Sequence, residues 1–218
     1  MTPTEQLLAT IDRHGAFGIV RTADADSART RADAALAAGL GALEVSLVTP
    51  GALRIIEALR SAAPYALVGA GTVTNETDAR SAIDAGAQFV VSPAVDVGVL
   101  SLAAREDVPA VPGAMTPTEI VTATTHGARV VKLFPAGTLG TRYLRELRGP
   151  LPHVALVPTG GIALDDVPAW WKAGAVGCGL GGALLDGTPA EIRAAVGRLA
   201  DQRAEFLGTA PTAGRNPS

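Results

Sequence analysis

Two kinds of helix-ending signal recur along this 218-residue chain at nearly constant intervals. Proline precedes an apolar run at Pro64, Pro109 and Pro152. Between these positions, the pair Gly-Ala stands between a helical pattern and another apolar run, at Gly41-Ala42, Gly86-Ala87, Gly127-Ala128 and Gly174-Ala175. Glycine supplies the left-handed turn after a helix and proline stops a helix, so both mark a passage from helix to strand. Together they predict one strand-helix unit about every 22 residues.

The apolar runs that follow these signals predict eight parallel strands. They cover residues 17–21, 42–47, 66–71, 89–93, 110–113, 130–134, 155–161 and 176–180. Helical patterns follow at 25–38, 50–62, 75–85, 96–105, 116–126, 140–147, 164–172 and 189–206, and a further helix at 3–14 precedes the first strand. Strict alternation of strand and helix predicts an α/β fold, and eight such units close into a (β/α)8 TIM barrel. An open doubly wound sheet is the alternative, but no Gly-x-Gly-x-x-Gly follows the first strand.

Length and charge narrow the class of protein further. We expect one barrel domain over residues 1–207 and a disordered tail over 208–218, which is rich in Gly, Pro, Thr and Ser. The net charge of −3 and the interspersed acids and bases argue against a nucleic-acid partner. The amino-terminal residues lack the basic start of a signal peptide, and no apolar stretch is long enough to span a bilayer. We therefore expect a cytoplasmic protein that does not bind membranes.

No cluster of metal ligands is visible in the sequence. Cys178 is alone, so it forms neither an internal disulfide nor a cysteine-built metal site. His14 and His126 end predicted helices and His153 precedes a predicted strand, which places all three at the amino-terminal end of the barrel. We expect no metal ion and no cofactor.

One lysine lies inside a predicted strand, in the run Val130-Val131-Lys132-Leu133-Phe134-Pro135. The chain otherwise prefers arginine, which supplies 16 of its 18 basic residues, and the only other lysine is Lys172. A strand buried on both faces is apolar throughout, so an ammonium group there must be neutralised, paired or used in chemistry. Burial can lower the pKa of lysine until a neutral, nucleophilic amine exists at neutral pH, which a guanidinium does not allow. Lys132 is therefore a candidate nucleophile, and a lysine that reaches from a strand into a carboxylate is the alternative.

Few polar residues lie at the carboxyl ends of the predicted strands, where barrels of this kind place their active sites. Arg21 ends the first strand, Glu44 lies within the second and Thr72 follows the third. Side chains alternate along a strand, so Lys132 shares one face with Phe134. If the faces that carry Glu44 and Lys132 both point inward, a carboxylate and an amine meet across the barrel. A buried structural ion pair is the alternative interpretation.

Glycine-rich turns follow the last two predicted strands. They are Pro158-Thr159-Gly160-Gly161-Ile162 and Gly179-Leu180-Gly181-Gly182-Ala183. Exposed backbone N–H groups at a helix start bind anions, and barrels commonly bind phosphate at these two loops. The pair of turns therefore indicates a phosphorylated ligand, although one double glycine alone is usually just a tight turn.

Several longer motifs, in order, resemble those of 2-keto-3-deoxy-6-phosphogluconate (KDPG) aldolases and their galactonate counterparts. The motifs are Ala-Gly-Leu-Gly-Ala-Leu-Glu-Val-Ser-Leu, Val-Gly-Ala-Gly-Thr-Val-Thr-Asn, Ala-Gly-Ala-Gln-Phe-Val-Val-Ser-Pro, Val-Pro-Gly-Ala-Met-Thr-Pro-Thr-Glu, Val-Lys-Leu-Phe-Pro-Ala and Pro-Thr-Gly-Gly-Ile, and the resemblance runs from about residue 16 to residue 206. It implies a class I aldolase that commonly forms trimers, with a Schiff base on Lys132 and Glu44 as general acid and base. It also implies that Thr72 helps to hold the pyruvate carboxylate. By the same resemblance, Pro93 and Phe134 line the pocket, and Gly160, Gly161, Gly181 and Gly182 bind the phosphate.

Two positions differ from the pattern of these relatives. Val48 stands where gluconate-type relatives have arginine and galactonate-type relatives have asparagine, and Ala183 follows Gly182 where many carry serine. We therefore expect carboxylate or phosphate binding to be weaker or to be supplied by another residue, such as Arg21.

The resemblance implies cleavage of a phosphorylated 2-keto-3-deoxy sugar acid to pyruvate and glyceraldehyde 3-phosphate. Galactonate-type relatives usually carry valine where this chain has Thr159, whose hydroxyl favours the gluconate epimer. The galactonate epimer and 4-hydroxy-2-oxoglutarate are alternative substrates. A phosphosugar isomerase or epimerase, in which Lys132 acts only by its charge, and a noncatalytic sugar-phosphate-binding barrel are the competing functions.

Overall fold

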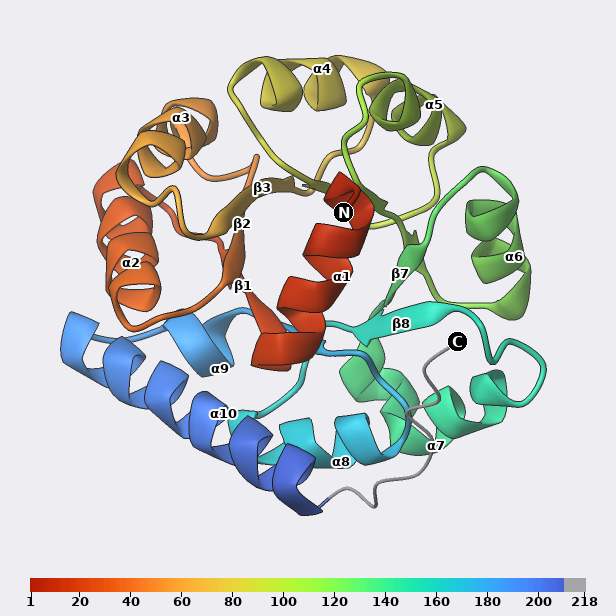
Figure 1. Ribbon diagram of the computed structural model, residues 1–218. Helices are drawn as coiled ribbons and strands as arrows, with labels where there is room; N and C mark the ends of the chain where they lie inside the picture. The colour runs from red at the N-terminus through yellow and green to blue at the C-terminus, as the bar shows by residue number, and fades with distance from the viewer. Residues whose placement is uncertain (210–218) are drawn as a thin grey trace.

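Parallel strands form a closed ring at the centre of the computed structural model, which describes residues 1–209 (Figure 1). The strands are β1 (Ala16–Val20), β2 (Ala42–Ser46), β3 (Leu67–Gly71), β4 (Val90–Val91), β5 (Ala110–Val111), β6 (Gly113–Ala114), β7 (Val130–Leu133), β8 (Ala155–Pro158) and β9 (Cys178–Leu180). Their pairing order is β5-β4-β3-β2-β1-β9 in one sheet and β6-β7-β8 in the other. A parallel bridge between Thr159 and Gly179 joins β8 to β9. The predicted (β/α)8 barrel is confirmed.

Helices surround the ring, and all of them except the last two connect one strand to the next (Figure 1). They are α2 (Ala25–Ala37), α3 (Ala52–Ala62), α4 (Glu76–Asp84), α5 (Val97–Arg105), α6 (Pro117–Thr125), α7 (Ala136–Arg148), a 3-10 turn η1 (Leu164–Asp166) with α8 (Val167–Lys172), α9 (Gly182–Leu185) and α10 (Pro189–Thr209). Residues 208 and 209 of the predicted tail belong to α10, and the rest of that tail lies outside the described residues.

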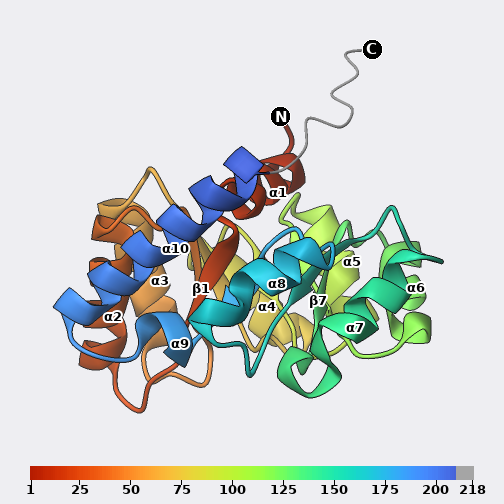
Figure 2. The ribbon, with the colours of Figure 1, turned by 90° about the horizontal axis from the view of Figure 1, so that it is seen from below.

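The helix α1 (Pro3–His14) lies across the amino-terminal end of the barrel (Figures 1 and 2). Thr2 and Glu5 form a capping box at its start, and Gly15 ends it in a left-handed conformation (φ 72°). Its buried residues Leu7 and Ile11 pack against the apolar side chains inside the ring, which are Phe17, Ala42, Leu67, Phe89, Val91, Val111, Val130 and Val157. The predicted amino-terminal helix is therefore confirmed, and it closes one end of the barrel.

Several predicted strands and helices are shorter or shifted by a few residues, and three further differences change the elements themselves. The predicted strand 110–113 is divided into β5 and β6 at Pro112, which has no N–H to donate to a ladder. The helix predicted at 140–147 begins earlier, at Ala136, and Gly140 (φ 75°, ψ 165°) interrupts it. The short helix α9 is not among the predicted elements, and its first two residues, Gly182 and Ala183, belong to the glycine-rich turn predicted at 179–183.

Candidate active site

Lys132 lies in β7, which is held on both sides by parallel neighbours. β7 pairs with β6 at Gly113 and with β8 at Val157, so the backbone around Lys132 is fixed. The side chain is 4% exposed, and its Nζ lies 4.8 Å from the centroid of the Phe134 ring. Burial lowers the pKa of the Lys132 ammonium, the charge of Glu44 opposes this shift, and Arg21 adds to it. A larger fraction of Lys132 is therefore neutral at a given pH than for a lysine in water.

Glu44 lies in β2, and its side chain is completely buried. Its carboxylate occupies the space that a side chain at residue 71 of β3 would need, so Gly71 is what gives it room. Neither carboxylate oxygen has a hydrogen-bond partner among the protein groups of residues 1–209. Burial raises the pKa of Glu44 to about 7, against the opposing effects of Lys132 and Arg21. A carboxyl group with this pKa can both accept and donate a proton near neutral pH.

Glu44 and Lys132 influence each other's pKa without a direct ion pair. Each appears among the causes of the other's shift, yet both Glu44 oxygens remain unpartnered. A structural ion pair needs direct hydrogen bonds to offset the cost of burying two charges. Glu44 and Lys132 therefore lack the direct contacts that a structural ion pair, the alternative interpretation, would require.

Polar side chains from three strand ends meet beside these two residues. The Thr72 hydroxyl lies 2.7 Å from the Ser46 hydroxyl, and Arg21 donates a hydrogen bond of 3.5 Å to the Thr72 oxygen. Thr72 adopts a left-handed backbone conformation (φ 59°), which for a β-branched residue costs on the order of 1–3 kcal/mol. Such strain persists where the surroundings fix it, and here it presents the Thr72 hydroxyl beside Arg21.

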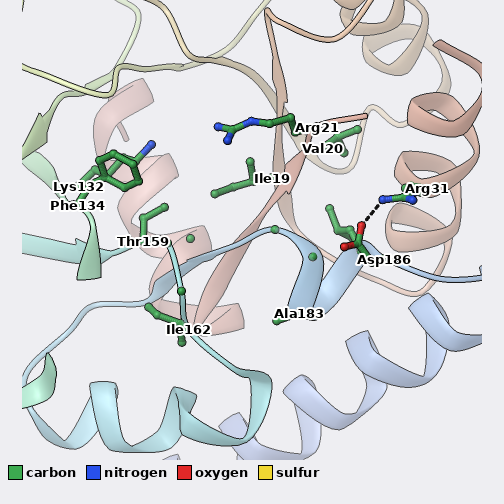
Figure 3. A pocket seen from close by; sticks show the side chains of 16 residues that line it. Ile19, Val20, Arg21, Arg31, Lys132, Phe134, Thr159, Ile162, Ala183 and Asp186 are labelled. Atoms are coloured by element: carbon green, nitrogen blue, oxygen red, sulfur yellow. Dashed lines mark hydrogen bonds and ion pairs between the residues drawn. The ribbon is translucent and has the colours of Figure 1, made fainter. Parts of the chain in front are cut away.

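A cavity of about 420 Å³ opens at the carboxyl ends of the strands (Figure 3). It brings together eight of the residues singled out from the sequence, which are Arg21, Lys132, Phe134, Thr159, Gly160, Gly161, Gly181 and Gly182. Glu44, Thr72 and Pro93 do not line it. Glu44 is completely buried, and Thr72 accepts a hydrogen bond from Arg21, which does line the cavity. The Pro93 carbonyl lies where a side chain at Gly113 would begin.

The glycine turn after β8 needs glycine for its backbone conformation. Gly160 (φ 88°) and Gly161 (φ 70°) are consecutive left-handed residues, and a Cβ at Gly160 would lie 3.0 Å from the Phe134 ring. The amides of Ala136 and Gly137 donate hydrogen bonds of 2.8 Å to the carbonyls of Thr159 and Gly160. The start of α7 therefore holds this turn in place at the wall of the cavity.

Two charged residues that line the cavity were missed in the sequence. Arg31 of α2 and Asp186, directly after α9, form an ion pair at the end of the cavity away from Lys132 (Figure 3). Arg31 lies on a polar helix and the pair joins residues 155 positions apart, so no local pattern marks it. The position of Asp186 four residues after Gly182 was the one available signal.

Within residues 1–209, no three His, Cys, Asp or Glu side chains gather in a group that could hold a metal ion. None of the helices in this part of the chain is long and apolar enough to cross a membrane.

Comparison with known proteins adds independent findings. A Pseudomonas aeruginosa 2-dehydro-3-deoxy-phosphogluconate aldolase is 40% identical over 137 residues, which cover 62% of this chain and 62% of that protein. An Escherichia coli 2-dehydro-3-deoxy-6-phosphogalactonate aldolase is 32% identical over 193 residues, covering 88% of this chain and 92% of that protein.

Solved structures share the fold over most of the chain. The KDPG aldolase of Zymomonas mobilis with 3-phosphoglycerate superposes with a TM-score of 0.80 at 28% identity, covering 88% of this chain and 94% of that one. The KDPG aldolase of Legionella pneumophila, with pyruvate captured as a covalent carbinolamine, gives a TM-score of 0.76 at 25% identity, covering 94% and 98%. A family model described as KDPG and KHG aldolase matches residues 10–195. This chain, with its barrel and its buried lysine, belongs to the KDPG and KHG aldolase family.

Proposed function

We propose that this chain is a class I aldolase that cleaves 2-keto-3-deoxy-6-phosphogluconate to pyruvate and glyceraldehyde 3-phosphate. The observation that carries the proposal is the pair of buried groups inside the barrel. Lys132 has a lowered pKa, and Glu44 has a pKa raised to about 7 and no hydrogen-bond partner. One supplies a nucleophile and the other a proton carrier.

In the first step, neutral Nζ of Lys132 attacks the keto carbon C2. The carbonyl oxygen takes up a proton, and the resulting carbinolamine loses water to give a protonated imine. Glu44 provides the proton for the departing water, directly or through a water molecule. The carbinolamine captured in the Legionella pneumophila relative supports this chemistry for the family fold.

In the second step, the C3–C4 bond breaks. The C4 hydroxyl loses its proton to the base, an aldehyde forms at C4, and the bonding electrons pass to the protonated imine to give an enamine. The enamine then takes a proton at C3, and water hydrolyses the imine to release pyruvate and restore the amine. Glu44, with a pKa near the working pH, exchanges these protons.

The cavity offers separate contacts for the two ends of this substrate. We assign the pyruvate carboxylate to Arg21, which lines the cavity, and to Thr72, to which Arg21 donates a hydrogen bond; Val48, 62% exposed and apolar, offers no charge for this carboxylate. The glycine turns at 160–161 and 181–182 lie at the wall where a phosphate would bind. Binding of 3-phosphoglycerate by the Zymomonas mobilis relative supports a phosphorylated three-carbon product.

Thr159 supports the gluconate epimer. Its side chain is 2% exposed, lines the cavity, and donates a hydrogen bond of 3.2 Å to the Val157 carbonyl. The hydroxyl oxygen remains able to accept a hydrogen bond from the C4 hydroxyl of the substrate. An unpaired buried hydroxyl costs about 1–3 kcal/mol, so we expect Thr159→Val to lower kcat/KM for the gluconate epimer about 5-fold to 150-fold relative to the galactonate epimer. A galactonate preference that valine leaves untouched would show that Thr159 does not set the choice.

A pyruvate-release assay tests the proposed function. Both phosphorylated epimers, their unphosphorylated analogues and 4-hydroxy-2-oxoglutarate serve as substrates. We expect the phosphorylated gluconate epimer to react fastest. We expect 4-hydroxy-2-oxoglutarate to be accepted as a slow second substrate, because Val48 is apolar where the resemblance places arginine or asparagine. Absence of pyruvate from every substrate would overturn the proposal in favour of a noncatalytic binding barrel.

We also propose, on the family resemblance, that the protein is a homotrimer in the cytoplasm and requires no metal ion. Light scattering after size exclusion gives the oligomeric state. Turnover in EDTA gives the metal requirement, and loss of activity that a divalent ion restores would contradict this part of the proposal.

A further inference from the structure

The carboxylate of Asp186 lies at the end of the cavity away from Lys132. Asp186 follows α9 and pairs with Arg31 of α2, and both line the same cavity as Lys132 (Figure 3). Their side chains are 67% and 27% exposed, so the arginine is the more enclosed of the two. An ion pair with this exposure contributes little to stability. Its position in the cavity is therefore the more informative property.

The two oxygens of the Asp186 carboxylate have different neighbours. One pairs with Arg31. The other lies against Gly182, in the space where a side chain at that position would begin. The carboxylate thus stands beside the second glycine turn, the turn that the proposed function assigns to the phosphate of the substrate.

We propose that Asp186 is a specificity-determining residue that limits the preference of this site for a phosphorylated substrate. This inference rests on the proposed function and refines its substrate class. A phosphate at the glycine turns meets the positive charge of Arg31 and the negative charge of Asp186 together. The carboxylate offsets the attraction of the guanidinium for a dianion, whereas a substrate that ends in a neutral hydroxyl is affected much less.

The substitution Asp186→Asn tests the inference through a ratio. The numerator is kcat/KM for the phosphorylated 2-keto-3-deoxy sugar acid, and the denominator is kcat/KM for the same acid without phosphate. We expect Asp186→Asn to raise this ratio at least about 5-fold at low ionic strength and Arg31→Gln to lower it by a similar factor.

The chain offers a matched control on α2. Asp33 pairs with Arg29 on the same helix and is exposed, and neither residue lines the cavity. Asp33→Asn therefore changes the net charge by the same amount outside the site and should leave the ratio unchanged. An Asp186→Asn ratio that is unchanged or lowered, while pyruvate is still formed, overturns this inference and leaves the proposed function standing.

A second measurement needs no turnover. Titration of the protein with inorganic phosphate, followed by calorimetry, reports the charge of the site directly. We expect Asp186→Asn to lower the Kd for phosphate at least about 5-fold relative to the wild type and to Asp33→Asn. Equal Kd values in all three proteins would overturn the inference even if no substrate were cleaved.

Discussion

The two ends of the barrel interior are built by the same strands but differ in polarity: one end is apolar, and the other contains buried ionisable side chains. At the amino-terminal end, Ala42 of β2 and Val130 of β7 join an apolar layer that α1 covers. Two residues further along the same strands, Glu44 and Lys132 bring buried ionisable groups into the interior. Because side chains alternate with a period of two, one strand supplies both layers on one face.

This difference separates stability from chemistry within one fold. The apolar end is completed by aromatic packing, with the Phe17 and Phe89 rings edge to face at 6.1 Å between centroids. The other end contains the fully buried carboxyl group of Glu44, whose pKa burial raises to about 7, so ionising this group inside the protein costs free energy. The apolar end therefore contributes to stability, and the polar end carries the ionisable groups on which the proposed chemistry depends.

The largest expected effect is on turnover, at the polar end. Glu44→Gln removes the proposed proton carrier but retains the shape of the side chain, so we expect the variant to fold and to lose about 100-fold to 10,000-fold in kcat. Steady-state kinetics of pyruvate release measure the loss, and circular dichroism checks the fold. A variant that unfolds, yet has full activity per folded molecule, would instead make Glu44 a structural residue.

The counterpart at the apolar end is Ile11→Ala in α1. Ile11 is fully buried against the barrel floor, so we expect the free energy of unfolding to fall by about 2–5 kcal/mol. Leu207→Ala, at an exposed position of α10, is the control and should change little. Denaturant unfolding measures both. A loss of kcat per folded molecule as large as that of Glu44→Gln would show that the two ends are not separate.

The raised pKa of Glu44 at the polar end should also make the free energy of unfolding depend on pH. The pKa of Glu44 is raised from 4.5 unfolded to about 7 folded, so the folded state binds more protons between these values. The contribution of protonated Glu44 to the free energy of unfolding is fully present below pH 4.5 and is lost as the pH rises through about 7. We expect the stability of the wild type to fall relative to Glu44→Gln by about 3 kcal/mol across this window. A constant difference between the two proteins would contradict the raised pKa.

Local patterns in the sequence were sufficient for the barrel and for the orientation of its main side chains. Glycine and proline at helix ends act within a few residues, so they identified the alternation directly. The period of two within a strand placed Lys132 and Phe134 on one face, and both line the cavity. The roles assigned to these residues remain predictions that the experiments above test.

The features that were missed depend on contacts between distant segments. Residues 136–140 contain two glycines and resemble a loop, but the amides of Ala136 and Gly137 find acceptors in the turn at 159–160, which allows α7 to begin there. Arg31 and Asp186 meet only because α2 and α9 are neighbours around the barrel. With four residues, α9 is too short to show a helical period.

Reductive trapping tests the central claim most directly. We expect incubation with pyruvate and borohydride to inactivate the protein irreversibly, because reduction of the imine fixes the three-carbon unit on the amine. Peptide mass spectrometry should locate the adduct on Lys132. Glu44→Gln should still be trapped, more slowly, and Lys132→Met should not be trapped at all. An adduct confined to Lys172 or to the amino terminus, or trapping that persists in Lys132→Met, would contradict the proposed mechanism.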